Sequence, residues 1–418
     1  MKILLSWLKD YIDINETPEK IADALNMAGL EVEEIIQPGK NLNNVVVGKI
    51  LSRDPHPDAE KLSLCSVDVN RGHPLQIVCG ANNMKAGDKV PVALIGARLP
   101  SGFEISKAKI RGIESSGMMC SKKELGISEE HGGLYILDES SEIGQNIVST
   151  LNLDEVIFEI SITPNRGDAL SHLGIARELS AIFNLPLHRN PLGNDDGDSS
   201  VADQISIEIQ DKELCPRYGA RVLHNVKVGP SPEWLRERLE KAGIRAINNV
   251  VDVTNYIMLD IGHPMHAFDY NLLTGKKIIV RQAAKEERIA TLDKAERNLD
   301  SSMLVIADNE KPVAIAGVMG GLHSSVTEAT TSVLLEAAFF DPTTVRKTSK
   351  RLGLMSDSSY RFERGTNIDN VPIALNEAVK LLKDIAGAQA VKGIADAYPR
   401  PEALRQIKVR TRRVNRVI

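Results

Sequence analysis

Residues 250–269 read VVDVTNYIMLDIGHPMHAFD, a helical pattern that ends abruptly. Apolar or β-branched side chains recur at three- and four-residue spacing, which is typical of one helix face; they are Ile247, Val250, Val251, Thr254, Ile257, Met258 and Ile261. We expect Asn249 to cap this helix, with Asp252 completing an arrangement much like a capping box. Gly262 suits the end of the helix, and Pro264 prevents its continuation. The stretch predicts a helix that packs against a core through one face.

Polar side chains beside this helix have no obvious structural task. Asn255 lies off the packed face, and we expect His263, His266 and Asp269 in a loop after the helix. A single histidine after a helix is more often structural than functional. A packed surface next to uncommitted polar groups nevertheless favours a binding site over simple scaffold.

The composition indicates a globular protein of several domains. The chain has 418 residues, which is too long for a single hydrophobic core. Its net charge of −5 argues against nucleic-acid binding by the whole surface, although a local basic patch is compatible with it. No apolar stretch is long enough to span a bilayer. The four cysteines form no Cys-x-x-Cys pair, so no metal site is indicated, and they suit the reducing cytoplasm; they are Cys65, Cys79, Cys120 and Cys215.

The pattern along the chain predicts an α+β multidomain protein. Residues 1–38 and 152–190 are expected to form one N-terminal α/β unit. Residues 39–151 hold five short strand candidates, which fit an inserted β-barrel of the OB type; they are VVVGKIL (45–51), KLSLCSVDV (61–69), LQIVCG (75–80), KVPVALIG (89–96) and KAKIRG (107–112). Residues 200–400 mix helices and strands as in an α+β domain. The basic tail, residues 402–418, is expected to open a further domain that is cut short.

The expected barrel is basic although the chain as a whole is acidic. Between residues 45 and 125 we count twelve Lys or Arg and eight Asp or Glu, a net charge of +4. This excess suits a surface that faces phosphates, but ordinary solvated lysines would give the same count. Only Phe103 offers an aromatic ring for base stacking, so backbone and shape contacts should dominate any contact with RNA.

Three segments of the second half stand out chemically. AIAGVMGG (314–321) reads as a buried strand that runs into a glycine loop, where Gly320 and Gly321 allow close approach of a ligand and leave N–H groups free to donate. A tight turn is the plain alternative. VLLEAAFFDP (333–342) places Glu336 in an apolar run, as a structural hydrogen-bond hub or a specificity group. GLMSDSSYRFERG (353–365) supplies Ser356 and Ser358.

Several of these segments, in this order along the chain, resemble one known family. The signature-like pieces are AGLEVEEI (28–35), HPDAEKLSLCSVDV (56–69), LQIVCGANN (75–83), GARLPSGFEI (96–105), KIRGIESSGMMCSKKELGI (109–127), ITPNRGDALSHLGIAREL (162–179), residues 250–269 and RFERG (361–365). The chain thereby resembles the N-terminal part of the β subunit of bacterial phenylalanyl-tRNA synthetase. The barrel pieces also resemble free-standing tRNA-binding barrels.

The resemblance implies two sets of site residues. For tRNA it implies the barrel, where we expect contacts from Lys49, Arg53, Lys61, Lys109, Arg111, Ser121, Lys122 and Lys123. It also implies an editing pocket that hydrolyses tyrosine wrongly esterified to the phenylalanine tRNA. The lining of that pocket maps onto Thr254, Asn255, His266, Gly320, Gly321, Glu336, Ser356 and Ser358, with His266 and Glu336 as candidates for catalysis. Many family members have Thr at position 356 and Ala at position 358, so Ser358 puts the efficiency of editing in doubt.

Elementary chemistry makes such a pocket reasonable. A site shaped for phenylalanine rejects a ligand that only adds a hydroxyl by roughly 10²-fold, whereas a site that hydrogen-bonds the hydroxyl discriminates far better. Glu336 suits the role of acceptor for the phenol. His266 could position a water or contact the ester, and its protonation is expected to change near neutrality. No Ser-His-Asp order is evident, so an ordered water assisted by the tRNA ribose is equally compatible.

The resemblance also implies partners and leaves two rival functions open. It implies a phenylalanine tRNA, an α subunit that forms a heterotetramer with the β subunit, and tyrosine or its ester in the pocket. ATP and Mg²⁺ are expected for the complete enzyme and not for this chain, which has no ATP motif. The rivals are a free-standing deacylase that acts in trans and a non-catalytic tRNA-binding or assembly module.

Overall fold

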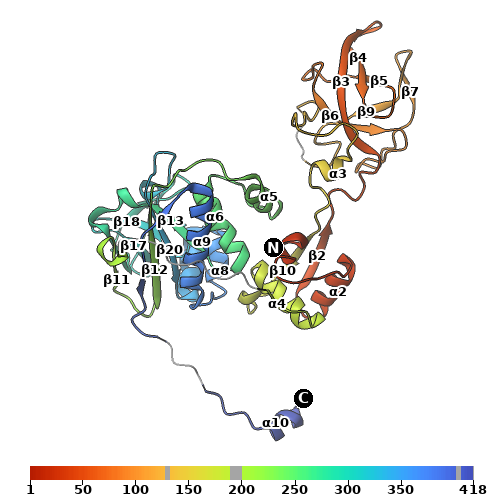
Figure 1. The fold of residues 1–418 in the computed structure, drawn as a ribbon. Coiled ribbons are helices and arrows are strands. Elements are labelled where there is room, and N and C mark those ends of the chain that lie inside the picture. Colours follow the sequence, from red (N-terminus) through yellow and green to blue (C-terminus); the bar gives the residue numbers. More distant parts are fainter. Residues whose placement is uncertain (128–131, 189–199, 402–405, 418) are drawn as a thin grey trace.

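The computed structural model describes residues 1–127, 132–188, 200–401 and 406–417. Three folded parts are visible: an N-terminal unit, a β-barrel and a larger domain built on two sheets (Figure 1). The protein is therefore α+β and multidomain, as the sequence predicts. In the described part of the chain, no helix is long and apolar enough to cross a membrane.

The N-terminal unit is built from segments on both sides of the barrel. Its antiparallel sheet has the order β1 (Lys2–Leu4), β10 (Ile157–Ser161) and β2 (Glu31–Ile36). Its helices are α1 (Leu5–Leu8), α2 (Pro18–Met27), η1 (Gly167–Ala169) and α4 (His172–Phe183). Thr17 caps α2 by accepting a hydrogen bond from the Lys20 N–H, with Pro18 at the first helical position.

The barrel contains a five-stranded antiparallel sheet. Its order is β5 (Leu75–Cys79), β4 (Ala59–Asp68), β3 (Val45–His56), β6 (Lys89–Leu94) and β9 (Gly117–Met119). The prediction that residues 107–112 form the fifth strand is wrong. That segment turns back at Arg111 and Gly112, which both have positive φ, and makes a separate hairpin of β7 (Ala108–Ile110) and β8 (Ile113–Ser115). Helix α3 (Ile147–Thr150) leads out of the barrel.

The larger domain stacks two sheets. The first, called here the central sheet, has the order β13 (Met265–Asp269), β20 (Val333–Phe339), β12 (Arg217–His224) and β21 (Gln389–Ala390), and β22 (Ala395–Ala397) also pairs with β12. The second, called the outer sheet, has the order β11 (Ser206–Ile209), β14 (Lys277–Gln282), β17 (Leu304–Ala307), β18 (Pro312–Ile315) and β19 (Met319–Gly320). A hairpin of β15 (Arg288–Ala290) and β16 (Glu296–Asn298) flanks the outer sheet.

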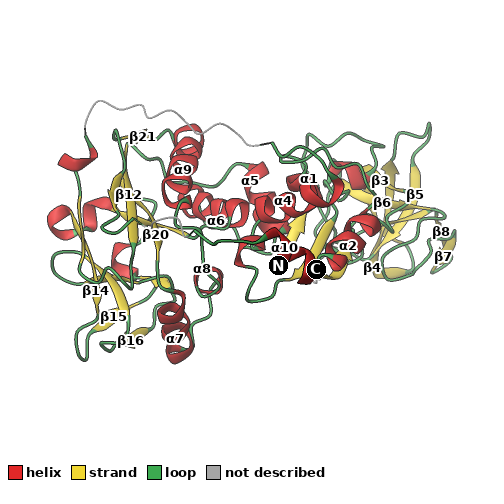
Figure 2. Ribbon diagram, turned by 90° about the horizontal axis from the view of Figure 1, so that it is seen from below, coloured by secondary structure: helices red, strands yellow, loops and turns green. Residues whose placement is uncertain are grey.

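Helices cover the face of the central sheet that points away from the outer sheet (Figure 2). The α-helices of the domain are α5 (Glu233–Lys241), α6 (Asn249–Ile261), α7 (Pro342–Leu352), α8 (Asp357–Phe362) and α9 (Asn370–Ala386), and the tail holds α10 (Thr411–Val417). Short 3-10 helices are η2 (Val201–Asp203), η3 (Tyr270–Leu272), η4 (Thr274–Lys276) and η5 (Leu322–Ser324). The side chains of α10 are largely exposed.

The central sheet separates two hydrophobic cores because side chains alternate along each strand. In β12, Tyr218 and Ala220 belong to the core between the sheets, whereas Leu223 belongs to the core under the helices. Helix α9 approaches β12 so closely that a Cβ at Gly219 would lie 2.7 Å from Val371. The core between the sheets is thus bounded on one side by the central sheet, whose other face is covered by helices, and on the other side by the outer sheet.

The helix predicted from residues 250–269 exists, but its cap differs. Asn248, and not Asn249, caps α6 by accepting hydrogen bonds from the N–H groups of Val250 and Val251. The Asn249 amide instead donates to Lys227 O and accepts from the Gly229 N–H, which ties the helix start to the preceding loop. Gly262 ends the helix with φ of 78°.

Burial around α6 is broader than one stripe. Ile247 lies before the helix and is 66% exposed, while Val253, Leu259 and Asp260 are buried in addition to the predicted face. The reason is that α6 contacts elements on several sides, including α4, α5, α9 and β13. The expectation that His266 and Asp269 follow in a loop is also wrong, because both lie in β13.

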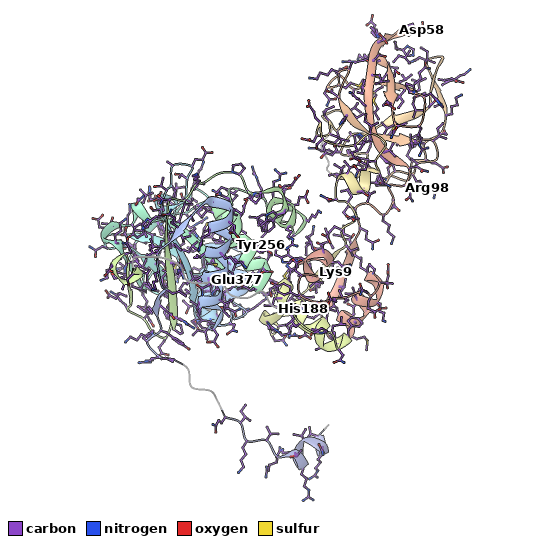
Figure 3. The ribbon with its side chains drawn as sticks, in the orientation of Figure 1. Lys9, Asp58, Arg98, His188, Tyr256 and Glu377 are labelled. Carbon is purple, nitrogen blue, oxygen red and sulfur yellow. The ribbon has the colours of Figure 1, made fainter. Side chains whose placement is uncertain are left out.

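A buried polar cluster joins α6 to the N-terminal unit. Asp260 accepts hydrogen bonds from Trp7 Nε1 at 2.8 Å and from the Tyr11 hydroxyl at 2.6 Å. Trp7 also stacks between His172 and Tyr256, and Figure 3 places Tyr256 on the side of the domain that faces the N-terminal unit. Burial raises the pKa of Asp260 to about 6. The N-terminal unit therefore anchors the helix that leads into β13.

Candidate functional site

The pairing of β13 with β20 brings two of the predicted residues together. His266 and Glu336 are direct partners in the antiparallel register, so their side chains project from the same face of the central sheet. That face points into the space between the two sheets. Residues 70 positions apart in the sequence thus become neighbours in one narrow space.

A small cavity lies at this point between the sheets, with a volume of about 60 Å³. Its lining includes four of the predicted residues, His266, Gly320, Glu336 and Ser358, together with Pro264, Met265, Ile306, Ala314, Ile315, Gly317, Val318, Met319, Phe340 and Phe362. This volume holds about two water molecules, since each occupies roughly 30 Å³ in the liquid. A phenol ring needs a larger volume. The flexible side chains of Met265 and Met319 can enlarge the cavity by changing rotamer.

Four other predicted residues do not line this cavity. The Thr254 hydroxyl donates to Val251 O within α6, and Asn255 lies elsewhere on the same helix. Ser356 caps α8 and donates to Val318 O at 2.8 Å, so its hydroxyl is used to hold the wall. Gly321 lines a different hollow, beside Arg288 and His323.

Gly320 makes room for the imidazole of His266. A Cβ at position 320 would stand 2.6 Å from His266 Nε2 and closer still to Cε1. The close approach expected for this glycine is therefore present, but its partner is a histidine of the protein. The expectation that the Gly321 N–H is free to donate is wrong, because it donates to Val313 O at 2.8 Å.

Burial sets the charge of both polar groups in the cavity. It raises the pKa of Glu336 to about 8 and lowers the pKa of His266 to about 4. At neutral pH we therefore expect a carboxylic acid opposite a neutral imidazole. The prediction that His266 changes protonation near neutrality is wrong, since no charged neighbour offsets the loss of solvent. Glu336 Oε2 and His266 Nε2 have no hydrogen-bond partner within the described residues.

Tyr218 is a site residue that the sequence did not reveal. It is fully buried in β12, two residues from Ala220, which pairs with Glu336. Its hydroxyl lies near enough to Glu336 to offset part of the effect of burial on the carboxyl pKa. No well-formed hydrogen bond joins them, however, and the Tyr218 hydroxyl also lacks a partner within the described residues. The alternation of apolar residues marks Tyr218 as inward-facing, but only the strand pairing places it beside Glu336.

The predicted tRNA-contacting residues are spread over the barrel. Lys49 and Arg53 lie on β3, Lys61 on β4, Lys109 on β7 and Arg111 in the hairpin turn, while Ser121, Lys122 and Lys123 follow β9. Arg53 donates to Ser63 Oγ and to Met84 O, which holds its guanidinium along the barrel wall. The Ser121 hydroxyl donates to Glu124 Oε2 and accepts from the Glu124 N–H. Lys122 lies over the Tyr135 ring at 5.3 Å.

Comparison with known proteins finds matches for both the barrel and the larger domain. A family described as "B3/4 domain" matches residues 214–387, and one described as "Putative tRNA binding domain" matches residues 45–146. The phenylalanine–tRNA ligase β subunit of Syntrophotalea carbinolica is 47% identical over 418 residues, which is 100% of this chain and 52% of that subunit. The corresponding subunit of Geobacter metallireducens gives the same identity and the same coverage of both chains.

Solved structures give a weaker likeness. An N-terminal fragment of the phenylalanyl-tRNA synthetase β subunit from Pyrococcus horikoshii is 16% identical and covers 57% of this chain and 63% of that chain. Its TM-score of 0.33 is too low to compare the folds in detail. The chain spans about half the length of the curated relatives that it matches. Over that half, the whole chain is similar to phenylalanine–tRNA ligase β subunits, and it contains a B3/4 domain and a putative tRNA binding domain.

Proposed function

We propose that this chain binds phenylalanine tRNA through its barrel and hydrolyses tyrosine wrongly esterified to that tRNA in the cavity between its two sheets. In the complete enzyme it would support aminoacylation by an α subunit, with ATP and Mg²⁺. Among the described residues no cluster of three or more His, Cys, Asp or Glu could hold a metal ion.

The observation that carries the hydrolytic part is the pairing of His266 with Glu336. Two buried polar atoms, His266 Nε2 and Glu336 Oε2, share one cavity without a partner in the described part of the chain. Leaving such atoms unpaired costs stability, about 1–3 kcal/mol for each group. A ligand that bonds to them would remove this cost, and a tyrosine ester has both a phenol and a carbonyl to offer.

The chemistry of the cavity suits recognition of a phenol. Because burial keeps Glu336 protonated at neutral pH, its carboxyl group both accepts from the phenol O–H and donates to the phenol oxygen. Phenylalanine would leave the carboxyl unsatisfied, which is the basis of discrimination. Neutral His266 orients a water toward the ester carbonyl carbon. The water adds there, the bond to the ribose oxygen breaks, and that oxygen leaves with the proton that the water gave up.

Deacylation of charged tRNA tests this proposal. Phenylalanine tRNA charged with tyrosine or with phenylalanine is incubated with this chain, alone and with an α subunit. We expect faster hydrolysis of the tyrosyl ester, and we expect His266→Ala to slow it. Activity without the α subunit would favour an enzyme that acts in trans. Unchanged hydrolysis in the double variant His266→Ala with Glu336→Ala would contradict the proposed site and leave a tRNA-binding module.

A further inference from the structure

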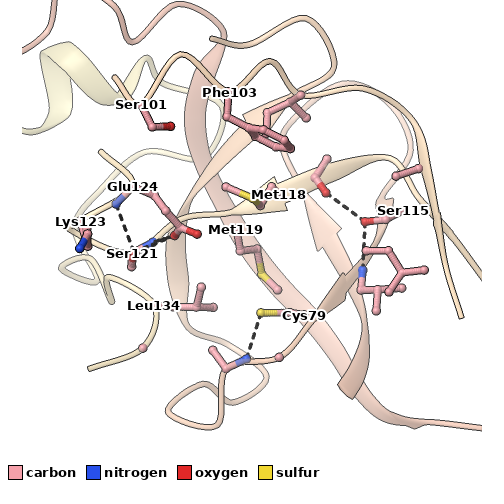
Figure 4. A pocket seen from close by; sticks show the side chains of 18 of the residues that line it. Cys79, Ser101, Phe103, Ser115, Met118, Met119, Ser121, Lys123, Glu124 and Leu134 are labelled. Atoms are coloured by element: carbon pink, nitrogen blue, oxygen red, sulfur yellow. Dashed lines mark hydrogen bonds between the residues drawn. The ribbon is translucent and has the colours of Figure 1, made fainter. Parts of the chain in front are cut away.

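A large cavity lies in the barrel, with a volume of about 660 Å³. Ligand pockets typically measure roughly 300–1,000 Å³, so it is large enough for a nucleotide-sized group. It lies between the end of β5, the β7–β8 hairpin, β9 and the turn after β9 (Figure 4). Neither the proposed hydrolysis nor the expected phosphate contacts explain a cavity of this size.

The walls of the cavity are mainly apolar. Phe103 lies on one side and Cys79 on the opposite side, with Met118 and Met119 between them (Figure 4). The Ser115 hydroxyl in the wall is occupied, because it accepts from the Val78 N–H and donates to Gly117 O. The occupant must therefore present apolar faces to these walls.

The rim of the cavity is polar and carries one residue of each charge, Lys123 and Glu124. Lys123 and Ser121 lie along one edge, where Ser121 bonds to Glu124 (Figure 4). On the opposite wall, the β7–β8 hairpin carries Lys109 and Arg111, both exposed. Ala108 and Ile110 of this hairpin line the cavity, so Lys109 between them projects to the other face, and a phosphate attached to an occupant would meet its positive charge at Lys123.

Phe103 is 60% exposed although it is a large aromatic residue. It is also the only Phe, Tyr or Trp that lines the cavity. An exposed aromatic ring beside an apolar cavity with a lysine at its rim is an arrangement by which proteins hold single-stranded RNA, since bases stack on the ring. The two methionines add sulfur contacts that favour an aromatic occupant.

We propose that the barrel cavity takes one unstacked nucleobase of the bound tRNA, which stacks on Phe103 above the floor of Met118 and Met119. This rests on the proposed tRNA binding and adds to it a site for a base. Lys123 meets the phosphate of the same nucleotide. The base must come from a loop or a single-stranded end, because a paired base cannot leave its stack cheaply.

Affinity for tRNA gives the first test. Phe103→Ala in the intact chain should weaken binding of a phenylalanine tRNA transcript about tenfold, in the range expected for one base–aromatic stack. The dependence on salt should stay the same, because no charge is removed. Leu51→Ala is the matched control, since Leu51 is a 46% exposed apolar residue of the same barrel outside the cavity. We expect no change in that variant.

Protection of Cys79 gives the second test, which reports on the cavity directly. Cys79 lines the cavity and is partly accessible, whereas Cys65, Cys120 and Cys215 are buried. Burial raises the pKa of Cys79, so labelling with a small thiol reagent is carried out at alkaline pH and read by peptide mass spectrometry. Saturating tRNA should slow labelling of Cys79, and Phe103→Ala should reduce this protection.

The outcomes separate this proposal from the proposed function. If the intact chain binds tRNA but Phe103→Ala matches Leu51→Ala and Cys79 labels at its free rate, the base site is wrong while tRNA binding stands. If Cys79 is protected by an α subunit and not by tRNA, the cavity docks a protein and the proposal is overturned. If the intact chain binds no tRNA, the proposed tRNA binding fails and the base site fails with it.

Discussion

The two cavities of this protein differ in nearly every physical respect. The one between the sheets has a volume of about 60 Å³ and contains buried polar atoms without partners among the described residues. The one in the barrel has a volume of about 660 Å³, mainly apolar walls and a polar rim with Lys123 and Glu124. The smaller cavity excludes water from two titratable groups and shifts their pKa values in opposite directions. The larger one leaves Phe103 exposed.

This difference shows that cavity size does not identify the site of chemistry. Hydrolysis with discrimination needs polar groups in a buried space, because hydrogen bonds count for more where little solvent competes for them. Recognition of a nucleic acid needs an open surface with stacking faces and positive charge. The two cavities therefore suit the two different roles that we propose for them, hydrolysis in the smaller one and binding of a base in the larger one.

Closing the small cavity should give the largest effect. In Gly320→Val the new side chain would overlap the His266 ring, so we expect hydrolysis of the tyrosyl ester to fall at least about 100-fold, the cost of misplacing a reacting group. Binding of tRNA should not change. Gly229→Ala is the control, because a Cβ there meets no atom within 4 Å. Equal hydrolysis by the two variants would contradict a role for this cavity.

Removing the phenol partner should give the next largest effect. Glu336→Ala should reduce discrimination of tyrosyl from phenylalanyl tRNA by about 1–3 kcal/mol, the cost of an unmade buried hydrogen bond. The ratio of the two kcat/KM values for deacylation measures this. The exposed Glu328 provides the control Glu328→Ala, which should behave like wild type. An unchanged ratio in Glu336→Ala would exclude this carboxyl group as the specificity element.

The raised pKa of Glu336 predicts a pH-dependent stability. The unfolded pKa is 4.5 and the folded value is about 8, so the stabilisation from the protonated acid is complete below about pH 4.5 and lost as the pH rises through 8. The free energy of unfolding of wild type minus that of Glu336→Gln should therefore fall between about pH 5 and pH 8.5. Urea unfolding of both proteins at the two pH values measures it. A difference that does not change with pH would show that Glu336 is ionised when folded.

Neutralising the basic turn of the barrel should give the smallest effect. The double variant Lys122→Gln with Lys123→Gln should lower tRNA affinity several-fold and reduce the slope of log affinity against log salt by up to about one unit for each phosphate that the lysines neutralise. Lys285→Gln in the larger domain is a control for net charge. An unchanged slope in the double variant would remove this turn from the tRNA-binding surface. Combined with Phe103→Ala, the series separates charge from stacking in the barrel.

Much of the fold was predictable because it depends on local patterns. The alternation in residues 45–96 predicts four barrel strands, and the spacing in residues 250–261 predicts α6 to within its cap. The fifth strand was misplaced because KAKIRG and the segment GMM are both short and strand-like, and the chain turns back at Arg111 and Gly112 to form β8 between them. Whether a segment of three residues forms a strand depends on which neighbouring strand it pairs with.

The candidate site between the sheets was only partly predictable for a similar reason. Gly320, Glu336 and Ser358 line the cavity with His266, while Ser356 is used as a helix cap and Thr254 bonds within its own helix. The sequence does not reveal whether the hydroxyl of a serine or threonine already makes a hydrogen bond with a backbone group.

The sequence by itself determined four of the barrel strands, helix α6, the net positive charge of the barrel and the resemblance to a family, because these follow from residue types at short spacing. Only the tertiary structure decided that His266 faces Glu336 and that Tyr218 lies beside Glu336. It also decided that burial keeps the His266 imidazole neutral and the Glu336 carboxyl group protonated. Pairing across strands depends on register between distant segments, and a pKa depends on solvent excluded by the whole fold.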